Sequence, residues 1–131
     1  MTLTGTIGES YAKFDPDAIY EAAALPNATD GTSGEFKIGR TQGGNQLNIL
    51  ADSTVNVATS ETLVFEVLSD STEDGSFADT RVIKTLTGPV TVEAGDVIAK
   101  FIAPDDVESI NKLKITASAD QSGDTIDAFI S

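Results

Sequence analysis

The sequence contains no cysteine, no histidine and no tryptophan. Without cysteine there is no disulfide framework, so cysteine usage does not indicate a redox compartment. Zinc sites normally need Cys or His ligands, so the composition effectively excludes one, and we expect no metal and no cofactor. General acid–base and nucleophilic catalysis also lose their usual side chains. This absence is the strongest argument from composition that the protein is not an enzyme.

Positive charge is scarce, because 8 Lys+Arg residues face 21 Asp+Glu residues and give a formal net charge of −13. Phosphate backbones and anionic lipid surfaces repel such a chain. We therefore expect neither direct binding to nucleic acid nor binding to a membrane. The acidity itself has two interpretations: it keeps a small domain soluble, or it keeps the exterior of a crowded assembly negative.

Long hydrophobic runs are also missing, and no stretch approaches the roughly 20 apolar residues that a membrane-spanning helix needs. The residues from Met1 to Glu9 include no basic segment and no apolar core, so we expect neither a signal peptide nor Sec-dependent export. The chain has 131 residues, of which 40% are hydrophobic, which fits one folded domain.

The first 14 residues are rich in Thr, Gly and Ser and are too polar to build a core. Their larger apolar side chains recur at spacings of three or four residues: Leu3, Ile7, Tyr11 and Phe14. Exposed apolar side chains favour aggregation, so we expect them to be covered. They either add an edge strand to the protein's own sheet or order against a partner. Together with Tyr20, these four residues are our candidate contacts to a partner or a sister subunit.

The segment from Asp15 to Pro26 predicts a short helix. Asp15 suits the N-cap, Pro16 suits the first helical position, and Pro26 marks a stop. The alanines between them are weak strand formers. The residues that follow, Asn27 to Gly34, have the composition of a loop. We therefore expect an arm, a short helix and a loop over residues 1–34, and a β-sandwich domain over residues 35–131.

From Glu35 onward, short runs of apolar residues alternate with turn signals, which predicts an all-β fold, a sandwich or a small barrel. The run from Thr62 to Leu68 has apolar residues on both faces and predicts a doubly buried strand. Val97 to Ile102 predicts a mostly buried strand, and Asp120 to Asp124 predicts a hairpin turn. The expected shared core comprises Leu63, Phe65, Val67, Val97, Ala99, Phe101, Leu113, Ile115 and Ala117.

Four features invite a chemical interpretation, and each has a simpler one. Asp70 to Gly75 resembles the start of a calcium loop, but Arg81 stands where the closing Glu belongs, so an acidic loop is expected. Ser10 and Lys13 form an S-x-x-K pattern without its companion motifs. Gly39 to Gly44 lacks the following helix of a phosphate-binding loop. None of the 21 acidic residues stands out as half of a catalytic carboxylate pair. We therefore expect no catalytic residue.

The part of the chain from Phe36 to Ser131 resembles the small capsid cement, or decoration, proteins of tailed bacteriophages, and is most similar to the Bordetella phage cement protein family. Five segments carry this resemblance in order: Asn48–Ser53, Asp70–Phe77, Val92–Ile98, Lys112–Ile115 and Gly123–Ile130. The Thr- and Gly-rich arm and the predicted helix are an addition to that pattern.

The resemblance implies a jelly-roll-like antiparallel β-sandwich that forms a homotrimer on the outside of a phage head. It implies a structural role, stabilising contacts between major capsid proteins in a virion assembled in the host cytoplasm. The alternative is a carbohydrate-binding or adhesive β-sandwich. Only 6% of the residues are aromatic, which argues against a stacking platform for sugars. A small hydrolase is the weakest interpretation.

Overall fold

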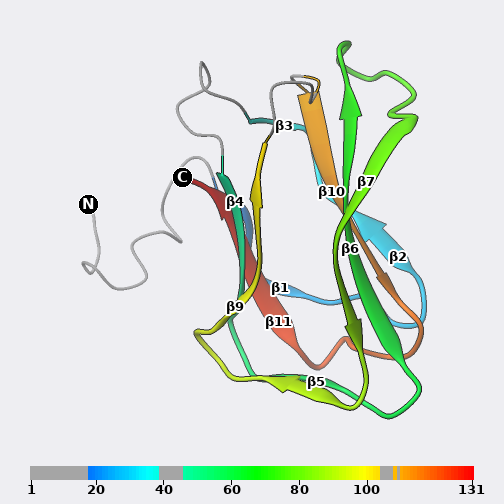
Figure 1. Ribbon diagram of the computed structural model, residues 1–131, viewed down its shortest axis with the longest axis vertical. Coiled ribbons are helices and arrows are strands. Elements are labelled where there is room, and N and C mark those ends of the chain that lie inside the picture. The colour runs from blue at the N-terminus through cyan, green and yellow to red at the C-terminus, as the bar shows by residue number, and fades with distance from the viewer. Residues whose placement is uncertain (1–17, 39–45, 104–107, 109) are drawn as a thin grey trace.

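The computed structural model describes residues 18–38, 46–103, 108 and 110–131, and every regular element within them is a β-strand (Figure 1). The strands are β1 (Ala18–Ala24), β2 (Asp30–Thr32), β3 (Phe36–Lys37), β4 (Gln46–Ala51), β5 (Val55–Val57), β6 (Thr62–Asp70), β7 (Asp79–Thr87), β8 (Val90–Val92), β9 (Val97–Ile102), β10 (Ile110–Ala117) and β11 (Thr125–Ile130). The prediction of an all-β fold is confirmed.

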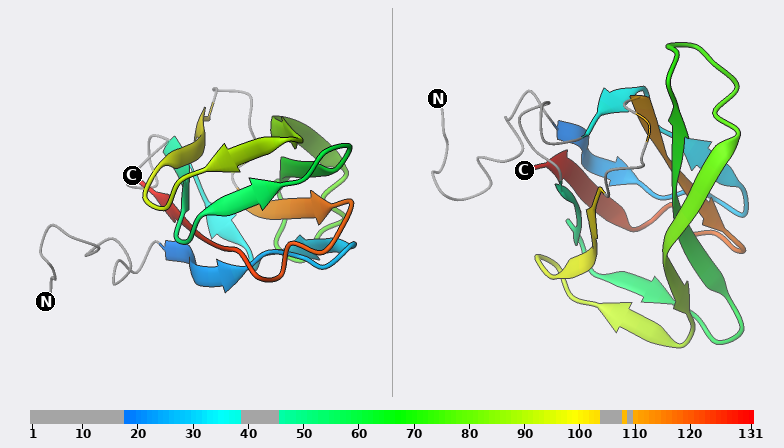
Figure 2. Two further views of the ribbon diagram at one scale, coloured as in Figure 1. Left: turned by 90° about the horizontal axis from the view of Figure 1, so that it is seen from below. Right: turned by 45° about the horizontal axis from the view of Figure 1, so that its top comes forward.

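The strands form two larger sheets that pack face to face (Figures 1 and 2). The first sheet has the order β1-β11-β4-β9. The second has the order β2-β10-β6-β7, and β3 also pairs with β10. A small third sheet consists of β5 and β8. All the strand pairs are antiparallel, so the structure confirms an antiparallel sandwich.

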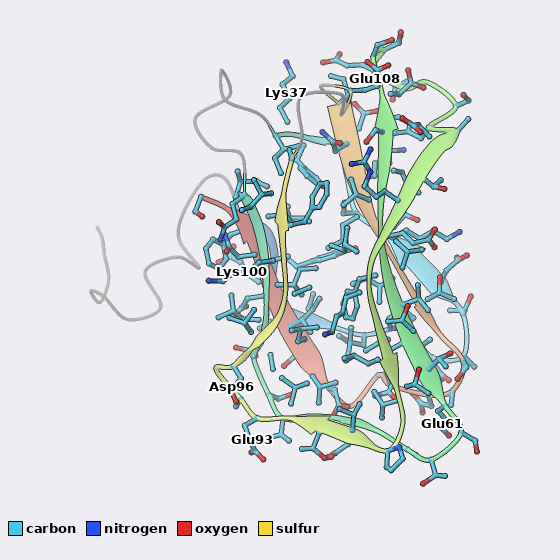
Figure 3. The ribbon with its side chains drawn as sticks, in the orientation of Figure 1. Lys37, Glu61, Glu93, Asp96, Lys100 and Glu108 are labelled. Atoms are coloured by element: carbon cyan, nitrogen blue, oxygen red, sulfur yellow. The ribbon has the colours of Figure 1, made fainter. Side chains whose placement is uncertain are left out.

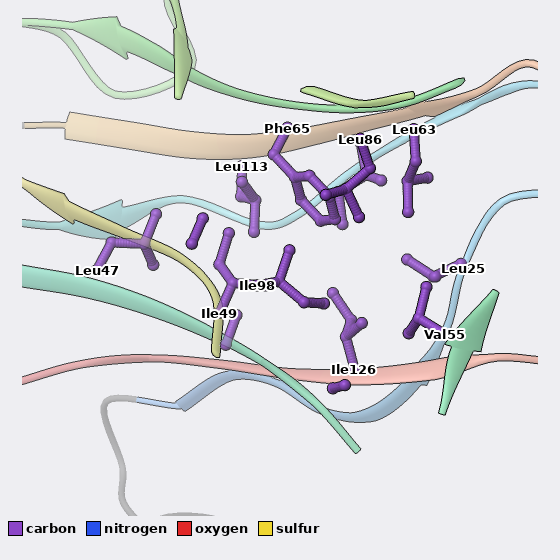
Figure 4. Packing of buried hydrophobic residues seen from close by; sticks show 14 of the residues in the cluster. Leu25, Leu47, Ile49, Val55, Leu63, Phe65, Leu86, Ile98, Leu113 and Ile126 are labelled. Atoms are coloured by element: carbon purple, nitrogen blue, oxygen red, sulfur yellow. The ribbon is translucent and has the colours of Figure 1, made fainter. Parts of the chain in front are cut away.

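The core lies between the two larger sheets and is filled from both of them (Figure 4). The second sheet contributes paired rows from β6 and β10, in which Phe65 lies opposite Ile115 and Val67 lies opposite Leu113. All four side chains are at most 3% exposed. Burying a side chain of this size stabilises the fold by about 1.5–3 kcal/mol. The predicted assignment of Leu63, Phe65 and Val67 and of Leu113, Ile115 and Ala117 to the core is therefore confirmed.

Strand β9 departs from the prediction that it is mostly buried. Val97 is 46% exposed and Phe101 is half-buried, although Ala99 lies in the core as expected. The cause is a β-bulge, because Ala99 pairs with Ile49 and Val97 pairs with the next residue of β4, which leaves Ile98 without an opposite residue. The bulge turns Ile98 inward beside Ala99 and Val97 outward.

Strand β6 is not buried on both faces as its sequence predicts. Its burial alternates along all nine residues, and Val64 and Leu68 on the outer face are only half-buried. The outer face of a two-layer sandwich has no third layer to cover it. The apolar residues on the outer face of β6 are therefore partly exposed to water. They do not indicate a strand covered by a layer on each face.

The predicted helix between Asp15 and Pro26 is wrong within the described residues, because Ala18 to Ala24 form β1. Alanine favours a helix over other ordinary residues by at most about 0.7 kcal/mol per position. As a strand, the segment pairs with β11 and packs Ile19 and Tyr20 against the core. Tertiary pairing therefore outweighs the local preference. The strand remains irregular, with two register shifts and a φ of 48° at Ala22.

Two further connections differ from the prediction. The expected loop from Asn27 to Gly34 contains β2, which pairs with β10. The expected hairpin at Asp120 to Asp124 instead carries the chain from β10 in the second sheet to β11 in the first. The buried Gln121 side chain helps to hold this crossing, since its Nε2 donates to the Asn56 carbonyl oxygen at 2.9 Å. A local turn signal indicates a change of direction but does not indicate which sheet receives the next strand.

Candidate interaction surfaces

Of the five predicted contact residues, the structure describes one. Leu3, Ile7, Tyr11 and Phe14 lie outside the described residues, so their role stays a prediction. Tyr20 lies in β1, where it pairs with Ala128 and packs half-buried against the core. Burial raises the pKa of the Tyr20 hydroxyl above its ordinary value. A contact role for Tyr20 also stays a prediction.

Tyr20 lines a hollow between β1 and β2, which are edge strands of the two sheets. The hollow has a volume of about 180 Å³, and Ile115 and Ile126 contribute apolar side chains to it. Drug-sized ligands occupy sites of roughly 300 Å³ or more. A cavity of about 150 Å³ holds a benzene molecule. The hollow therefore fits a single aliphatic or aromatic side chain.

Strands β1 and β2 beside this hollow carry carboxylates and no cation, and the same edge of the second sheet continues in β3 with the exposed Lys37. We define the β1–β2 side as residues 18–34, which include Glu21 and Asp30 and no Lys or Arg. Both carboxylates are exposed, and Asp30 also lines the hollow. One cation approaches from β10, where the Lys114 Nζ lies 3.6 Å from Asp30 Oδ2. Glu21 takes part in no ion pair within the described ranges.

The opposite side of the sandwich is formed by β7 and β9, which are the other edge strands of the two sheets. We call these two strands the β7–β9 side. They lie next to each other, and the Arg81 guanidinium of β7 stands 5.9 Å from the centre of the Phe101 ring of β9. A cation over an aromatic face contributes roughly 0.5–1 kcal/mol at a wet site. This contact links the two sheets along one edge.

The β7–β9 side combines apolar exposure with positive charge. All the exposed large hydrophobic side chains in the described part of the chain belong to it: Val82, Val97 and Ile102, at 56%, 46% and 63% exposure. Three cations also lie on these strands, Arg81, Lys84 and Lys100, against a single carboxylate at the start of β7. Lys100 points away from the second sheet (Figure 3). Val82 faces outward from the second sheet, whereas Val97, Lys100 and Ile102 face outward from the first, so this side carries two separate patches.

Sequence reasoning missed the β7–β9 side. The segment from Val97 to Ile102 contains one Lys among five apolar residues, which indicated a buried strand. The signal that was present is the shared parity of Lys100 and Ile102, which puts both side chains on one face of the strand. Whether that face is wet depends on where β9 lies in the sheet, and the sequence of β9 does not specify its neighbours.

The acidic loop after β6 is organised around the carboxylate of Asp70. One Asp70 oxygen accepts from the N–H of Thr72 and the other from the N–H of Phe77, both at 3.0 Å. These hydrogen bonds, that of Thr72 first, lower the pKa of Asp70 below its ordinary value. Phe77 is buried, and the Lys112 Nζ stands 4.5 Å from the centre of its ring. The geometry is that of a carboxylate that supports its own loop.

The remaining chemical motifs give no assembled site in the described residues. Ser10 and Lys13 of the S-x-x-K pattern lie outside them, as do Gly39 to Gly44 of the glycine-rich loop. Within the described ranges, no group of three or more His, Cys, Asp or Glu side chains is arranged to hold a metal ion. No helix in that part of the chain has the length and apolarity needed to span a membrane.

In comparisons with known proteins, no family model and no curated protein matches the chain.

Proposed function

We propose that the protein is a structural capsid cement protein that binds the outside of a phage head and stabilises contacts between major capsid proteins. The proposal includes a homotrimer on the outer surface of the virion, assembled in the host cytoplasm. It includes no catalytic activity, no cofactor, and no direct contact with nucleic acid or membrane.

The observation that carries this proposal is where the resembling segments fall in the fold. Three of the five provide strands: Asn48–Ser53 begins in β4, Lys112–Ile115 lies in β10, and Gly123–Ile130 contains β11. The other two form connections, the loop after β6 and the passage from β8 to β9. The resemblance therefore follows the sandwich through both sheets, as a relationship of the whole domain would.

The strand order supports a jelly roll as the finer description of the sandwich. The eight positions β1, β2 with β3, β4, β6, β7, β9, β10 and β11 divide into the orders β1-β11-β4-β9 and β2-β10-β6-β7. In a jelly roll, eight strands of two Greek keys divide between two facing sheets. The short β5–β8 pair extends the connections that leave β4 and β7.

The physical mechanism of a cement protein is mass action. A protein that binds the assembled shell and not the free subunits stabilises the shell by an amount that grows with its concentration. Bound at 100 times its dissociation constant, such a protein contributes about 2.7 kcal/mol per site. The net charge of −13 suits an exterior that faces solvent, because packaged DNA would repel it.

The alternative of a carbohydrate-binding module finds less support in the structure. Sugar-stacking platforms use exposed aromatic faces. Among the described residues, no Phe or Tyr is exposed: Phe65 and Phe77 are buried, and the others are half-buried. The half-buried aromatic side chains therefore favour the structural role over a carbohydrate-binding one.

The test is co-sedimentation with shells assembled from the major capsid protein of the same genome. We expect the protein to bind expanded shells at saturable stoichiometry and to raise the temperature at which they rupture. Bovine serum albumin, another acidic protein, serves as the control for charge alone. Absence of saturable binding, or binding with no effect on rupture, would contradict the proposal.

A further inference from the structure

The hollow beside Tyr20 is a place where the core of the sandwich is reached from its side. Two of its lining residues, Ile115 and Ile126, belong to the core and are only 3% and 1% exposed. Its lining also includes small residues such as Ala23 and Gly31, which leave the space between β1 and β2 unfilled. One apolar side chain of another segment would fill this space and be buried against the core.

Two strand edges border the hollow. Within the described part of the chain, β1 pairs only with β11 and β2 pairs only with β10, so each has one edge without a neighbouring strand. Such an edge accepts an extended segment as an additional strand. The two register shifts of β1 keep any added ladder short, so the fit of a side chain into the hollow decides which segment binds.

The chain that precedes β1 contains a segment with the pattern of an edge strand. Residues 2–7 read Thr-Leu-Thr-Gly-Thr-Ile, and both Thr and Ile favour strands. In an extended chain the three threonines lie on one face, and Leu3 and Ile7 lie on the other. Asp15 and Pro16 are turn-forming residues between this segment and β1. The local sequence therefore favours a hairpin in which the segment returns along β1.

We propose that residues 2–7 of the chain itself form an edge strand antiparallel to β1 and that the Ile7 side chain fills the hollow. The length of chain before β1 selects Ile7. A turn of about four residues before Ala18 places Ile7 opposite Ala24, and a turn of about eight residues places it opposite Tyr20. Both of these β1 residues line the hollow. Ile7 therefore lies beside the hollow over the whole range of ordinary hairpin turns.

The other apolar residues of the arm are less well placed. The chain from Phe14 to Ala18 spans at most about 13 Å, whereas Ala23 lies about 17 Å along β1 from Ala18, so Phe14 is too close to β1 to reach the hollow. Tyr11 comes opposite a hollow-lining residue of β1 only in the shortest of these hairpins, and Leu3 only in the longest. These three side chains remain for contacts to a partner, so the inference does not rest on the proposed function.

The test uses disulfide trapping in the full chain, which has no cysteine of its own. The double variant Ile7→Cys with Ala23→Cys is treated with oxidised glutathione and analysed on a non-reducing gel and by mass spectrometry. We expect a disulfide within one chain, because a disulfide needs two Cα atoms within about 7 Å. Phe14→Cys with Ala23→Cys is the matched control, with the same two thiols on a shorter stretch of chain. It should form no disulfide between the two engineered positions.

A second measurement needs no cross-link. The rate at which Ellman's reagent reacts with the single thiol of Ala23→Cys reports whether the hollow is covered. We expect this rate to rise at least tenfold when Ile7→Ser is added. Val82→Cys, exposed on the outer face of the second sheet, is the control and should react at the same rate with and without Ile7→Ser. Circular dichroism verifies that each variant keeps its β-sheet content.

Three results would overturn the inference. A disulfide that links two chains would assign the hollow to the arm of a second copy. A double variant that stays reduced, or a thiol rate that Ile7→Ser leaves unchanged, would show that Ile7 does not fill the hollow. The capsid assay is read separately: if the disulfide forms within one chain and capsids are not bound, the proposed function fails and this inference stands. If capsids are bound and the thiols stay reduced, the reverse holds.

Discussion

Replacing Phe65 and Phe101 separately by Ala tests how the sandwich is packed, because the same change is made at two depths. Phe65 is fully buried, and its ring lies between the two sheets (Figure 4). Removing it leaves an enclosed cavity, and the loss of transfer and packing energy together amounts to about 3–5 kcal/mol. Total stabilities of small domains are about 5–15 kcal/mol, so this loss is a large fraction.

Replacing Phe101 by Ala should lower the free energy of unfolding much less, although the sequence of its strand is typical of a buried one. Its ring is half-buried, so roughly half of the transfer energy of about 1.5–3 kcal/mol is lost, and the space opens to water without leaving a cavity. Loss of the Arg81 guanidinium from its face adds about 0.5–1 kcal/mol. We expect a total of about 1–2.5 kcal/mol.

The assay is urea unfolding at equilibrium, followed by far-UV circular dichroism, for wild type and both variants. If Phe65→Ala does not fold, Phe65→Leu is compared with Phe101→Leu, and the larger loss, below about 1.5 kcal/mol, is expected at Phe65. Equal losses for the two Ala variants, or a larger loss at Phe101, would refute the assignment of Phe65 to the core and of Phe101 to an edge.

Four further outcomes are expected. Deleting Met1 to Phe14 should leave the β-sheet content intact and abolish capsid binding, and a truncated chain that binds and assembles normally would make the arm dispensable. Gly88→Ala should lower the free energy of unfolding by about 2 kcal/mol or more in the urea assay, because a Cβ at Gly88 would overlap the Ala58 carbonyl oxygen; Gly123→Ala, with open space at its Cβ, is the control. The lowered pKa of Asp70 implies a stabilising contribution that is present above the unfolded value near 3.9 and is lost as the pH falls further, so the melting temperatures of wild type and Asp70→Asn should converge below about pH 4. Calcium at millimolar concentration, or a chelator, should leave the melting temperature unchanged, and a rise of several degrees with calcium would contradict the interpretation of the acidic loop.

Several elements could be predicted from sequence because their pattern and their environment agree. In β6 and β10, apolar residues recur at every second position through Leu63, Phe65 and Val67 and through Leu113, Ile115 and Ala117, and all six are buried. The period of two is the geometry of the extended chain itself. Residues of this kind specify which side of a strand faces inward without reference to any other strand.

The acidic loop could be predicted for a similar reason. A succession of Asp, Ser, Thr and Gly residues disfavours a strand locally. The short Asp70 side chain accepts hydrogen bonds from N–H groups a few residues away. The candidate interaction surfaces could be predicted from the sequence only in part. The sequence draws attention to Tyr20, but the hollow beside it is lined by β1, β2, β10 and β11 together, and no single segment encodes it.

What the sequence by itself determined is therefore local: the extended conformation of most segments, the inward parity of β6 and β10, and the sign of the net charge. The tertiary structure decided which strands lie at an edge. Ala18 to Ala24 became a strand because β11 offers it a partner, at a gain that exceeds the helix preference of alanine. Val97 is exposed because β9 ends its sheet and contains a bulge. Edge position depends on contacts between segments far apart in the chain, and no local preference encodes it.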